Sequence, residues 1–586
     1  MSAWQYWVQD IADRLSEVLG VKISPSEIVR PPEASMGEFS FACFRYAKER
    51  KKNPAELAYE LAQALTKDHS DIAQIEALGP YVNFRLDTGE AVLRVVRDIE
   101  TKGETYGSSM RGEGKEFLFE YAQMNSHKEV HVGHFRNLTM GVSLVRLLRR
   151  AGWNVVPMSY HGDVGAHVAK CLWRLVVSFR GSVDNLTKEE VTTFFERLST
   201  EKKTGKYLGE VYAESSQQLA AAPERKEEVS RVLQWLEGHD PVWDFLWRET
   251  RRWSLEDLGR DFAELGVELK RQYLESEVVD RGQQMVNHLL SEGIAKASQG
   301  AIVIDLENQK LGIFLVRKSD GTSLYATKDL ALAEKKLEEY PEASRSLILV
   351  DNRQGFYFKQ LFATLEKMRI QPIPEFCGFE FVTLKSGAMS SREGNVVTYQ
   401  SFREAVLNYA RAELIARHPD WSEGKITHTA WALAMGGMKF GMLKQDGDKI
   451  FTFDLEESLA FDGATGPYCQ YAATRLNSIL RKASASEKEL NGPIEPVFVH
   501  ATEKALALSL AAFPSIVDQA ACELRPAVVA QWCHETAQRM NDFYRDVPVL
   551  ESQGTERIAR LRLIASARQV LEQGLNLLGI PLPDEM

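Results

Sequence analysis

The sequence predicts a multidomain α/β protein in which a helical insertion interrupts a parallel sheet and a further domain lies on each side. Three observations support this prediction. The chain has 586 residues, too many for a single hydrophobic core. Strand-like and helix-like segments alternate between residues 116 and 160, which is typical of a doubly wound sheet. From about residue 401 onward, apolar residues recur at helical spacing, which predicts an all-α bundle.

Residues 1–110 predict a small α+β domain. An amphipathic helix opens the chain, and a second helix follows Asn53-Pro54. The segment GPYVNFRL (79–86) is apolar and aromatic after a Gly-Pro turn, which predicts a strand. Residues 103–114 are rich in Gly, Ser and Thr and predict a linker to the next domain.

Residues 111–400 are predicted to form the parallel-sheet domain. Strands at 116–122 and 154–160 enclose a helix from about 131 to 150, and SLILVD (346–351) resumes the strand pattern. The stretch at about 170–300 is charged and rich in tryptophan, and we predict that it is a helical insertion. Residues 401–455 are predicted to be a connecting helical segment, and 456–586 a terminal helical domain.

The composition indicates a soluble folded protein and excludes several other classes. A hydrophobic fraction of 44% argues against disorder. The net charge is −11, so contact with nucleic acid must use local basic patches. Six cysteines without a CxxC pair suit a reducing cytosol. The first helix carries acids, unlike a signal peptide, and no run approaches the ~18 apolar residues that cross a bilayer. We therefore expect a cytoplasmic protein that contacts no membrane and holds no tightly bound metal.

The first motif that could carry chemistry is His131-Val132-Gly133-His134, between a predicted strand and a predicted helix. Two histidines three residues apart at a helix start can both point into the space above the sheet. A helix N-terminus offers free N–H groups and partial positive charge, which suits a triphosphate. Gly133 lets a ligand approach closely because it has no Cβ. We predict that His131, Gly133 and His134 bind ATP and that the histidines are catalytic. The alternative is two surface histidines that cap a helix.

The second motif, Met389-Ser390-Ser391-Arg392, lies in a loop between two glycines. Charge that develops at an α-phosphate needs donors that arrive with the transition state, and a mobile loop can supply them. Met389, Ser390 and Ser391 are therefore predicted to contact ATP, and Ser390 and Arg392 to contribute to catalysis. The alternative is a solvated turn.

In this order, and about 250 residues apart, the two motifs resemble the HIGH and KMSKS signatures of class I aminoacyl-tRNA synthetases. Five segments resemble the arginyl-tRNA synthetases in particular, from the catalytic domain to the last residues. They are AQMNSHKEVHVGHFRN (122–137), LYATKDLALAEKK (324–336), DNRQGFYFKQLF (351–362), TGPYCQYAATRLNSILRKA (465–483) and LLGIPLPDEM (577–586).

The resemblance implies a class I Rossmann-like catalytic domain with a helical insertion, a small α+β N-terminal domain that contacts tRNA, and an all-α C-terminal anticodon-binding bundle. It also implies a monomer with the activity of an arginine–tRNA ligase. Such an enzyme attaches L-arginine to tRNA(Arg) through an arginyl-adenylate and consumes ATP, which brings Mg²⁺ with it.

The physical chemistry of arginine recognition agrees with this family. A guanidinium is planar and permanently charged, so a carboxylate held in its plane binds it best. Tyr325 and Asp329 are i and i+4 on one helix face, so Asp329 can take the guanidinium while Tyr325 packs on it. The resemblance implies that Glu120 and Asn125 hold the α-amino end of arginine and that Gln360 completes the pocket. For each residue alone, the alternative is a surface helix ion pair.

The second signature departs from the family pattern. Ala388 and Ser391 stand where KMSKS has its two lysines. In the resembled family, a lysine shortly before the HIGH motif is thought to compensate, and Lys128 occupies that position here. We therefore predict that Lys128 stabilises phosphate charge. Tyr357 stands where the family usually has histidine and receives no predicted role.

Two regions could contact RNA. Aromatic stacking surfaces and positive charge suit unstacked anticodon bases, and the predicted residues of this kind are Tyr468, Gln470, Tyr471, Arg475 and Arg481. The first domain carries a basic cluster made of Arg45, Lys48, Arg50, Lys51 and Lys52. The alternative for both regions is a solvated helix face.

Two rival functions stay open at this stage. Another class I synthetase is disfavoured by the Tyr325 and Asp329 pair, because a neutral amino acid needs no such carboxylate. A catalytically inactive paralogue that binds tRNA is favoured only by Ala388 and Ser391.

Overall fold

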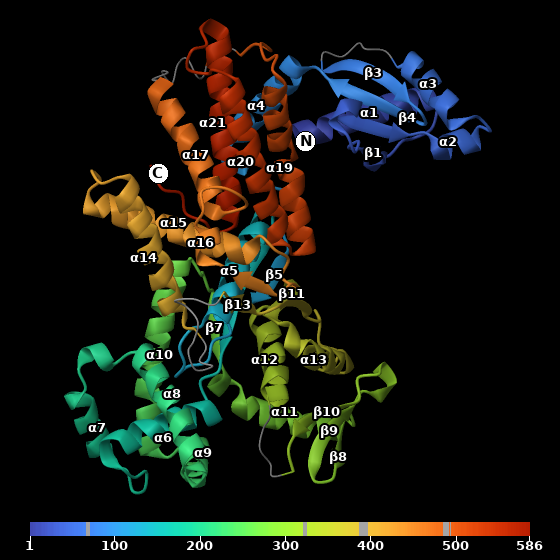
Figure 1. Ribbon diagram of the computed structural model, residues 1–586. Helices are drawn as coiled ribbons and strands as arrows, with labels where there is room; N and C mark the ends of the chain where they lie inside the picture. Colours follow the sequence, from blue (N-terminus) through green and yellow to red (C-terminus); the bar gives the residue numbers. More distant parts are fainter. Residues whose placement is uncertain (66–70, 320–324, 386–396, 484–491, 493) are drawn as a thin grey trace.

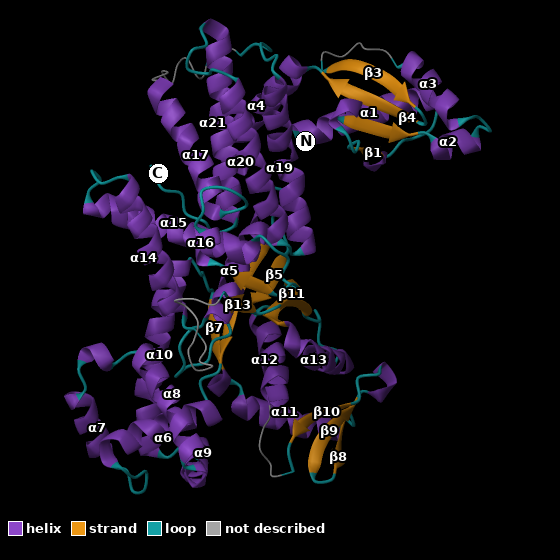
Figure 2. Ribbon diagram, in the orientation of Figure 1, coloured by secondary structure: helices purple, strands orange, loops and turns teal. Residues whose placement is uncertain are grey.

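The computed structural model describes residues 1–65, 71–319, 325–385, 397–483, 492 and 494–586. A parallel sheet lies at the centre, with a helical bundle at one end and a helical insertion at the other (Figure 1). The N-terminal domain stands beside the bundle, away from the central sheet. Within the described ranges, strands form four sheets and helices make up most of the remaining chain (Figure 2).

The N-terminal domain is an antiparallel sheet with helices packed on it. Its strand order is β1-β2-β4-β3, with bounds Ile28–Val29, Phe39–Ala42, Tyr81–Leu86 and Ile72–Leu78. The helices are α1 (Ala3–Leu19), α2 (Phe44–Glu49) and α3 (Pro54–Ala64). Asn53 caps α3 through its side chain, and Pro54 takes the first helical position, where its missing N–H costs nothing. Next, α4 (Thr88–Lys102) packs against the C-terminal bundle.

The central sheet has five parallel strands in the order β12-β11-β5-β6-β7. Their bounds are Glu375–Phe379, Ala343–Asp351, Glu116–Glu120, Asn154–His161 and Arg271–Leu274. The direction of strand addition reverses between β5 and β11. A crevice at the carboxyl ends of the strands is expected at such a switch point.

Both faces of the central sheet are covered, which is why its strands are apolar almost throughout. On one face, α5 (Val132–Arg150) separates the sheet from the C-terminal helices. The other face packs against α11 (Val279–Ser291), α12 (Tyr325–Glu339) and α13 (Gly355–Lys367).

The insertion is a five-helix unit with its own core, which includes Trp173, Trp243 and Trp253. Its helices are α6 (Ala166–Arg180), α7 (Lys188–Arg197), α8 (Gly205–Ala221), α9 (Lys226–Glu237) and α10 (Pro241–Leu265). It is shorter than the predicted 170–300, because β7 returns to the central sheet after Leu265.

A small antiparallel sheet follows α11, which the helical prediction for this stretch missed. Its strands are β8 (Ala295–Ser298), β9 (Ala301–Asp305) and β10 (Ile313–Arg317). Gln299 and Gly300 both have positive φ, as a two-residue hairpin turn between β8 and β9 requires.

The C-terminal part is helical, as predicted, apart from one short strand. Its helices are α14 (Tyr399–Arg417), α15 (Glu423–Leu443), α16 (Leu455–Ser458), α17 (Gly466–Ala483), α19 (Ala501–Glu523), α20 (Pro526–Asp546) and α21 (Gly554–Leu577). The strand β14 (Phe451–Phe453) pairs in parallel with β13 (Val382–Leu384).

Helix α19 is long and apolar, but it contains no uninterrupted apolar run of ~18 residues. Among the described residues it is the one helix whose length and hydropathy would allow a membrane span. It packs against α20 and α4, and half of its apolar window is buried inside the protein. Its apolar residues therefore supply part of the bundle core.

Candidate active site

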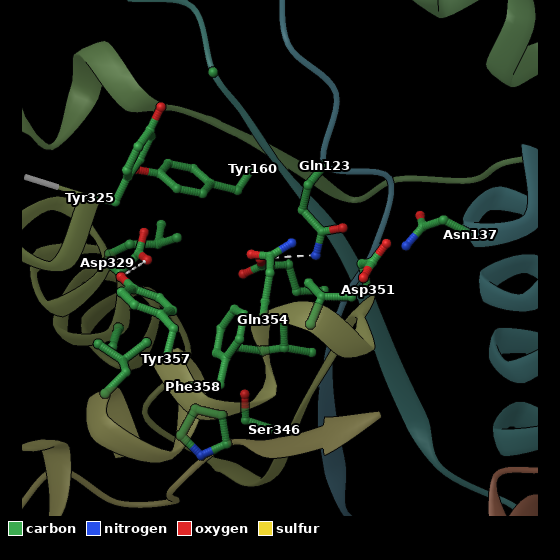
Figure 3. Close-up of a pocket in the computed structure, with 18 of the residues that line it drawn as sticks. Gln123, Asn137, Tyr160, Tyr325, Asp329, Ser346, Asp351, Gln354, Tyr357 and Phe358 are labelled. Atoms are coloured by element: carbon green, nitrogen blue, oxygen red, sulfur yellow. Dashed lines mark hydrogen bonds between the residues drawn. The ribbon is translucent and has the colours of Figure 1, made fainter. Parts of the chain in front are cut away.

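A cavity of about 530 Å³ opens at the carboxyl ends of β5, β6 and β11 (Figure 3). The predicted residues that line it are Glu120, Asn125, His131, Gly133, His134, Tyr325 and Asp329. These come from segments about 200 residues apart in sequence, and the fold brings them to one space. Met389, Ser390, Ser391 and Arg392 lie outside the described residues.

The two histidines at the start of α5 cap each other. The backbone N–H of His134 donates to Nδ1 of His131 at 3.2 Å, and the N–H of His131 donates to Nδ1 of His134 at 3.3 Å. The rings stack with their centroids 3.6 Å apart. A Cβ at position 133 would lie 3.0 Å from the His131 ring. Glycine at this position therefore leaves space for the stacked histidine rings.

The mutual capping fixes where each histidine carries its proton. An Nδ1 that accepts a hydrogen bond bears no proton, so a neutral ring keeps its N–H at Nε2. Burial lowers the pKa of both histidines, and the positive charge of Lys128 lowers it further. Two neutral rings with free Nε2–H groups can therefore donate to an anion in the cavity.

The residues that follow the second motif are joined to the first one. The backbone N–H of Val132 donates to the carbonyl of Val397 at 3.2 Å, and the N–H of Tyr399 donates to the carbonyl of Val130 at 2.7 Å. His131 and Thr398 form an antiparallel bridge. The fold thus anchors the chain leaving the second motif beside the first.

Asp329 is held by a phenol. The hydroxyl of Tyr357 donates a hydrogen bond to Oδ2 of Asp329, and both side chains face the cavity (Figure 3). Burial raises the pKa of Asp329 to about 7, while the bond from Tyr357 opposes this shift. The nearby charges of Glu120 and Glu275 raise it further. The charge of Lys336 lowers the pKa of Asp329 in turn, but no ion pair to Asp329 forms among the described residues.

Glu120 is paired, in contrast to Asp329. Its Oε2 forms a buried ion pair with Nζ of Lys336, which lies two turns after Asp329 on α12. Its Oε1 accepts from Nε2 of Gln123 at 3.2 Å. Neither partner was predicted. Lys336 lies within a segment quoted for the family resemblance, at i+7 from Asp329, and that spacing could have revealed it.

One predicted pocket residue is wrong, and a neighbour takes its place. Gln360 does not line the cavity; its amide instead donates to the backbone carbonyls of Leu311 (2.8 Å) and Ile313 (3.3 Å). Gln354, six residues earlier, faces the cavity (Figure 3). Both glutamines belong to the motif at 351–362, and the sequence alone did not separate their orientations.

Asn125 meets the backbone that follows β6. Its side-chain oxygen lies so close to Gly162 that a Cβ there would be only 2.2 Å away.

The next residue, Asp163, is fully buried. Its carboxylate accepts hydrogen bonds from the Arg251 guanidinium at 2.8 Å and from the Ser276 hydroxyl at 2.7 Å. Asp163 therefore ties α10 to the segments that follow β6 and β7.

Lys128 does not line this cavity; it lines a separate, smaller pocket with Glu129, Lys206 and Asp261. Its Nζ lies 4.8 Å from the ring centroid of Tyr212 on α8. Its charge nevertheless acts on the buried His131 and His134 rings, so it lies close to the space they face.

The predicted RNA-contacting residues of α17 divide into two groups. Gln470 was predicted to contact RNA, but it is fully buried and donates to the carbonyls of Ala432 (2.8 Å) and Pro581 (2.6 Å). It therefore serves packing. The guanidinium of Arg475 lies 4.0 Å from the centroid of Tyr544. The remaining predicted residues stand at or near the surface: Tyr468 and Tyr471 are half-buried, and the exposed Arg481 pairs with Glu585 at 2.7 Å.

Comparison with known proteins covers the chain from end to end. Residues 96–455 match the model for the catalytic domain of class I (R) tRNA synthetases. Residues 5–86 match the arginyl tRNA synthetase N-terminal domain, and residues 469–586 match the DALR anticodon binding domain. The predicted three-part fold class is thereby confirmed.

Individual relatives agree with these models. The arginine–tRNA ligase of Bdellovibrio bacteriovorus is 34% identical over 95% of this chain and 94% of its own length. That of Lactobacillus johnsonii is 31% identical over 99% of both chains. The arginyl-tRNA synthetase structure from Thermus thermophilus superposes with a TM-score of 0.78 at 26% identity, covering 99% of this chain and 100% of that one. The chain therefore belongs to the arginyl-tRNA synthetase family of class I aminoacyl-tRNA synthetases.

Proposed function

We propose that this chain attaches L-arginine to tRNA(Arg) in two steps within the cavity described above. The arginine carboxylate attacks the α-phosphate of ATP, which forms arginyl-adenylate and expels pyrophosphate. The terminal ribose hydroxyl of the tRNA then attacks the activated carbonyl and releases AMP. The observation that carries this proposal is a buried carboxylate, Asp329, in the same cavity as the paired histidines.

Asp329 is the proposed partner of the substrate guanidinium. The bond from the Tyr357 hydroxyl orients the carboxylate, which suits bidentate recognition of a planar cation. Tyr160 contributes a buried hydroxyl for which no partner exists among the described residues. That oxygen faces the same space and can accept from a guanidinium N–H. Tyr325, at the mouth, is 67% exposed and would pack over the bound side chain.

The α-amino end of arginine is assigned to Glu120 and Asn125, at the carboxyl end of β5. Glu120 already carries charge balanced by Lys336. An ammonium group would therefore join an existing network of Glu120, Lys336 and Gln123. Gln354 replaces Gln360 in this proposal, because it lines the cavity and Gln360 does not.

The ATP phosphates are assigned to the start of α5. The Nε2–H groups of His131 and His134 and the helix dipole can all act on the same anion, and Gly133 leaves room for it. Lys128, Met389, Ser390, Ser391 and Arg392 are proposed to add donors from the rim. Mg²⁺ is expected to arrive with the nucleotide, held mainly by its phosphates, because Glu120 and Asp329 already bond protein groups.

For the tRNA, we propose two contact surfaces. Arg475 with Tyr468, Tyr471 and Arg481 would meet the anticodon, because this surface combines rings with positive charge. The basic cluster of the first domain, Arg45, Lys48, Arg50, Lys51 and Lys52, is exposed and would contact phosphates elsewhere on the tRNA. We further propose that the enzyme acts as a cytoplasmic monomer.

The test is arginine-dependent ATP–pyrophosphate exchange, run with and without tRNA. Exchange with arginine, at a rate that other amino acids do not support, is the expected result. Tight binding of tRNA without exchange for any amino acid would instead identify an inactive paralogue. The relatives named above are both arginine–tRNA ligases. This supports the ligase over the inactive paralogue.

Replacing Tyr357 by phenylalanine is expected to raise the KM for arginine about tenfold. A hydrogen bond to a charged group contributes ~1.5–3 kcal/mol, and ~1.4 kcal/mol is a factor of ten. Because the Tyr357 bond lowers the pKa of Asp329, its loss also shifts the pH profile of KM upward. Tyr357→His keeps a donor and should behave more like the parent enzyme. An unchanged KM and pH profile in Tyr357→Phe would refute the role.

Arginine is expected to raise the unfolding temperature more at pH 8 than at pH 6. The pKa of Asp329 is raised to about 7, so its neutral form favours folding, and that contribution is lost as pH rises through 7. Arginine binds the ionised form and compensates at high pH. Thermal unfolding with and without arginine measures this, and Asp329→Asn should remove the pH dependence. Equal shifts at both pH values in the parent enzyme would contradict the prediction.

A further inference from the structure

The helical insertion holds the segment just before the histidine motif. His127 is fully buried and has a positive φ of 60°, a conformation that is costly for a residue with a side chain. Its backbone N–H donates to the Ser254 hydroxyl at 2.9 Å. The Thr250 hydroxyl donates to the Leu246 carbonyl, so it accepts from Nε2–H of His127, at 2.9 Å. Two bonds from α10 thus support this strained residue.

A second insertion helix, α8, reaches the next two residues. It passes so close that a Cβ at Gly209 would lie 2.5 Å from the Glu129 side chain and 3.2 Å from its backbone nitrogen. Three residues later on α8, the ring of Tyr212 lies under Lys128, with Nζ 4.8 Å from its centroid. Residues 127–129 are therefore each contacted by the insertion.

Lys128 is the residue in this segment with a proposed role in chemistry. It lies three residues before the first histidine of the motif and three residues after Asn125, which lines the cavity. A free lysine has many rotamers, and holding its charge in one place costs conformational entropy. The face of a tyrosine ring attracts an ammonium group within ~6 Å. This attraction can offset the entropy cost, so that the lysine is ordered before the nucleotide binds.

We propose that Tyr212 is a positioning residue for adenylate formation, which holds the Lys128 ammonium at the rim where the ATP phosphates bind. The inference rests on the proposed role of Lys128 in phosphate stabilisation. In this proposal the helical insertion contributes to adenylate formation, because α8 and α10 together fix the position of Lys128.

The experiment compares variants of Tyr212 in arginine-dependent ATP–pyrophosphate exchange with the full-length protein and tRNA. Tyr212→Leu should lower kcat roughly tenfold, with the KM for arginine unchanged. Tyr212→Phe keeps the ring face and should restore most of the rate. Tyr207→Leu is the matched control: Tyr207 lies on the same helix, but its ring lies beneath Lys202, 5.8 Å away. That variant should behave like the parent.

A double-mutant cycle separates this inference from the one it rests on. Lys128→Met should lower kcat about 100-fold, and adding Tyr212→Leu should lower it no further. If Lys128→Met has normal kcat, the proposed role of Lys128 fails. If Lys128→Met is impaired but Tyr212→Leu is normal or faster, the positioning role of Tyr212 fails alone. Additive losses in the double variant would also overturn it, because Tyr212 would then act by another route.

Discussion

Replacing Asp329 by asparagine is expected to lower kcat/KM for arginine about 1000-fold in ATP–pyrophosphate exchange. The substrate guanidinium would enter a cavity in which its proposed carboxylate partner has become a neutral amide. Leaving one member of a buried ion pair without its partner costs ~3–5 kcal/mol, and ~1.4 kcal/mol corresponds to a factor of ten. Asparagine has nearly the same shape as aspartate, so the loss would report charge and not packing.

Folding of the Asp329→Asn variant should be intact or improved. Burial raises the pKa of Asp329 to about 7, which means that ionising this carboxyl in the folded protein costs free energy. Thermal unfolding without substrate is therefore expected to show an equal or higher transition temperature. Glu334→Gln serves as a control on the same helix, because Glu334 pairs with Arg281 outside the cavity. Normal exchange in Asp329→Asn would exclude this carboxylate as the arginine partner.

Replacing His134 by asparagine is expected to lower kcat about 100-fold while the KM for arginine changes little. Removing one preorganised donor to a developing oxyanion typically costs a factor of ~10²–10³. The asparagine side-chain oxygen occupies nearly the place of Nδ1, so it can still accept from the His131 backbone N–H. It has no group near the position of Nε2, so the donor to the phosphate is lost.

Glutamine at position 134 is the matched comparison. Its amide nitrogen reaches nearly to the position of Nε2, so His134→Gln should retain more of kcat than His134→Asn. Steady-state exchange at saturating arginine, with ATP varied, distinguishes the two variants. If both lose the same activity, the histidine acts through the helix cap and not through its Nε2–H group.

The sequence predicted the fold class well because its signals are local. The β5–α5–β6 unit is visible as apolar strands around an amphipathic helix, and Asn53-Pro54 marks the start of α3. The sheet of β8–β10 was missed because its strands have only four or five residues each. The buried centre of β9 and the alternation in β10 are too short to stand out from the helical pattern around them. Its turn residues, Gln299 and Gly300, were the available signal.

The site was predicted less completely, because side-chain orientation depends on packing. Gln354 and Gln360 share one motif, but Gln354 ends the turn before α13, whereas Gln360 lies inside that helix and turns toward Leu311 and Ile313. They therefore do not both face the cavity. Likewise, Gln470 sits among aromatic and basic residues in sequence, yet α17 turns it toward α15. Tyr357 gave no signal from its type alone, because its role depends on the position of Asp329 across the cavity.

The contact between Gly162 and Asn125 restricts which residues position 162 can accept when duplicated gene copies diverge. Any side chain at position 162 would collide with the Asn125 amide, whose oxygen would lie 2.2 Å from a new Cβ. The Asn125 amide could move aside, but it would then leave its place in the cavity lining, so we expect a copy that still charges tRNA to keep glycine here more often than a copy released from catalysis. Most single-nucleotide changes in a glycine codon that alter the residue introduce a side chain. Substitution of Gly162 is therefore expected early in copies that have lost the aminoacylation activity, and this chain retains the glycine.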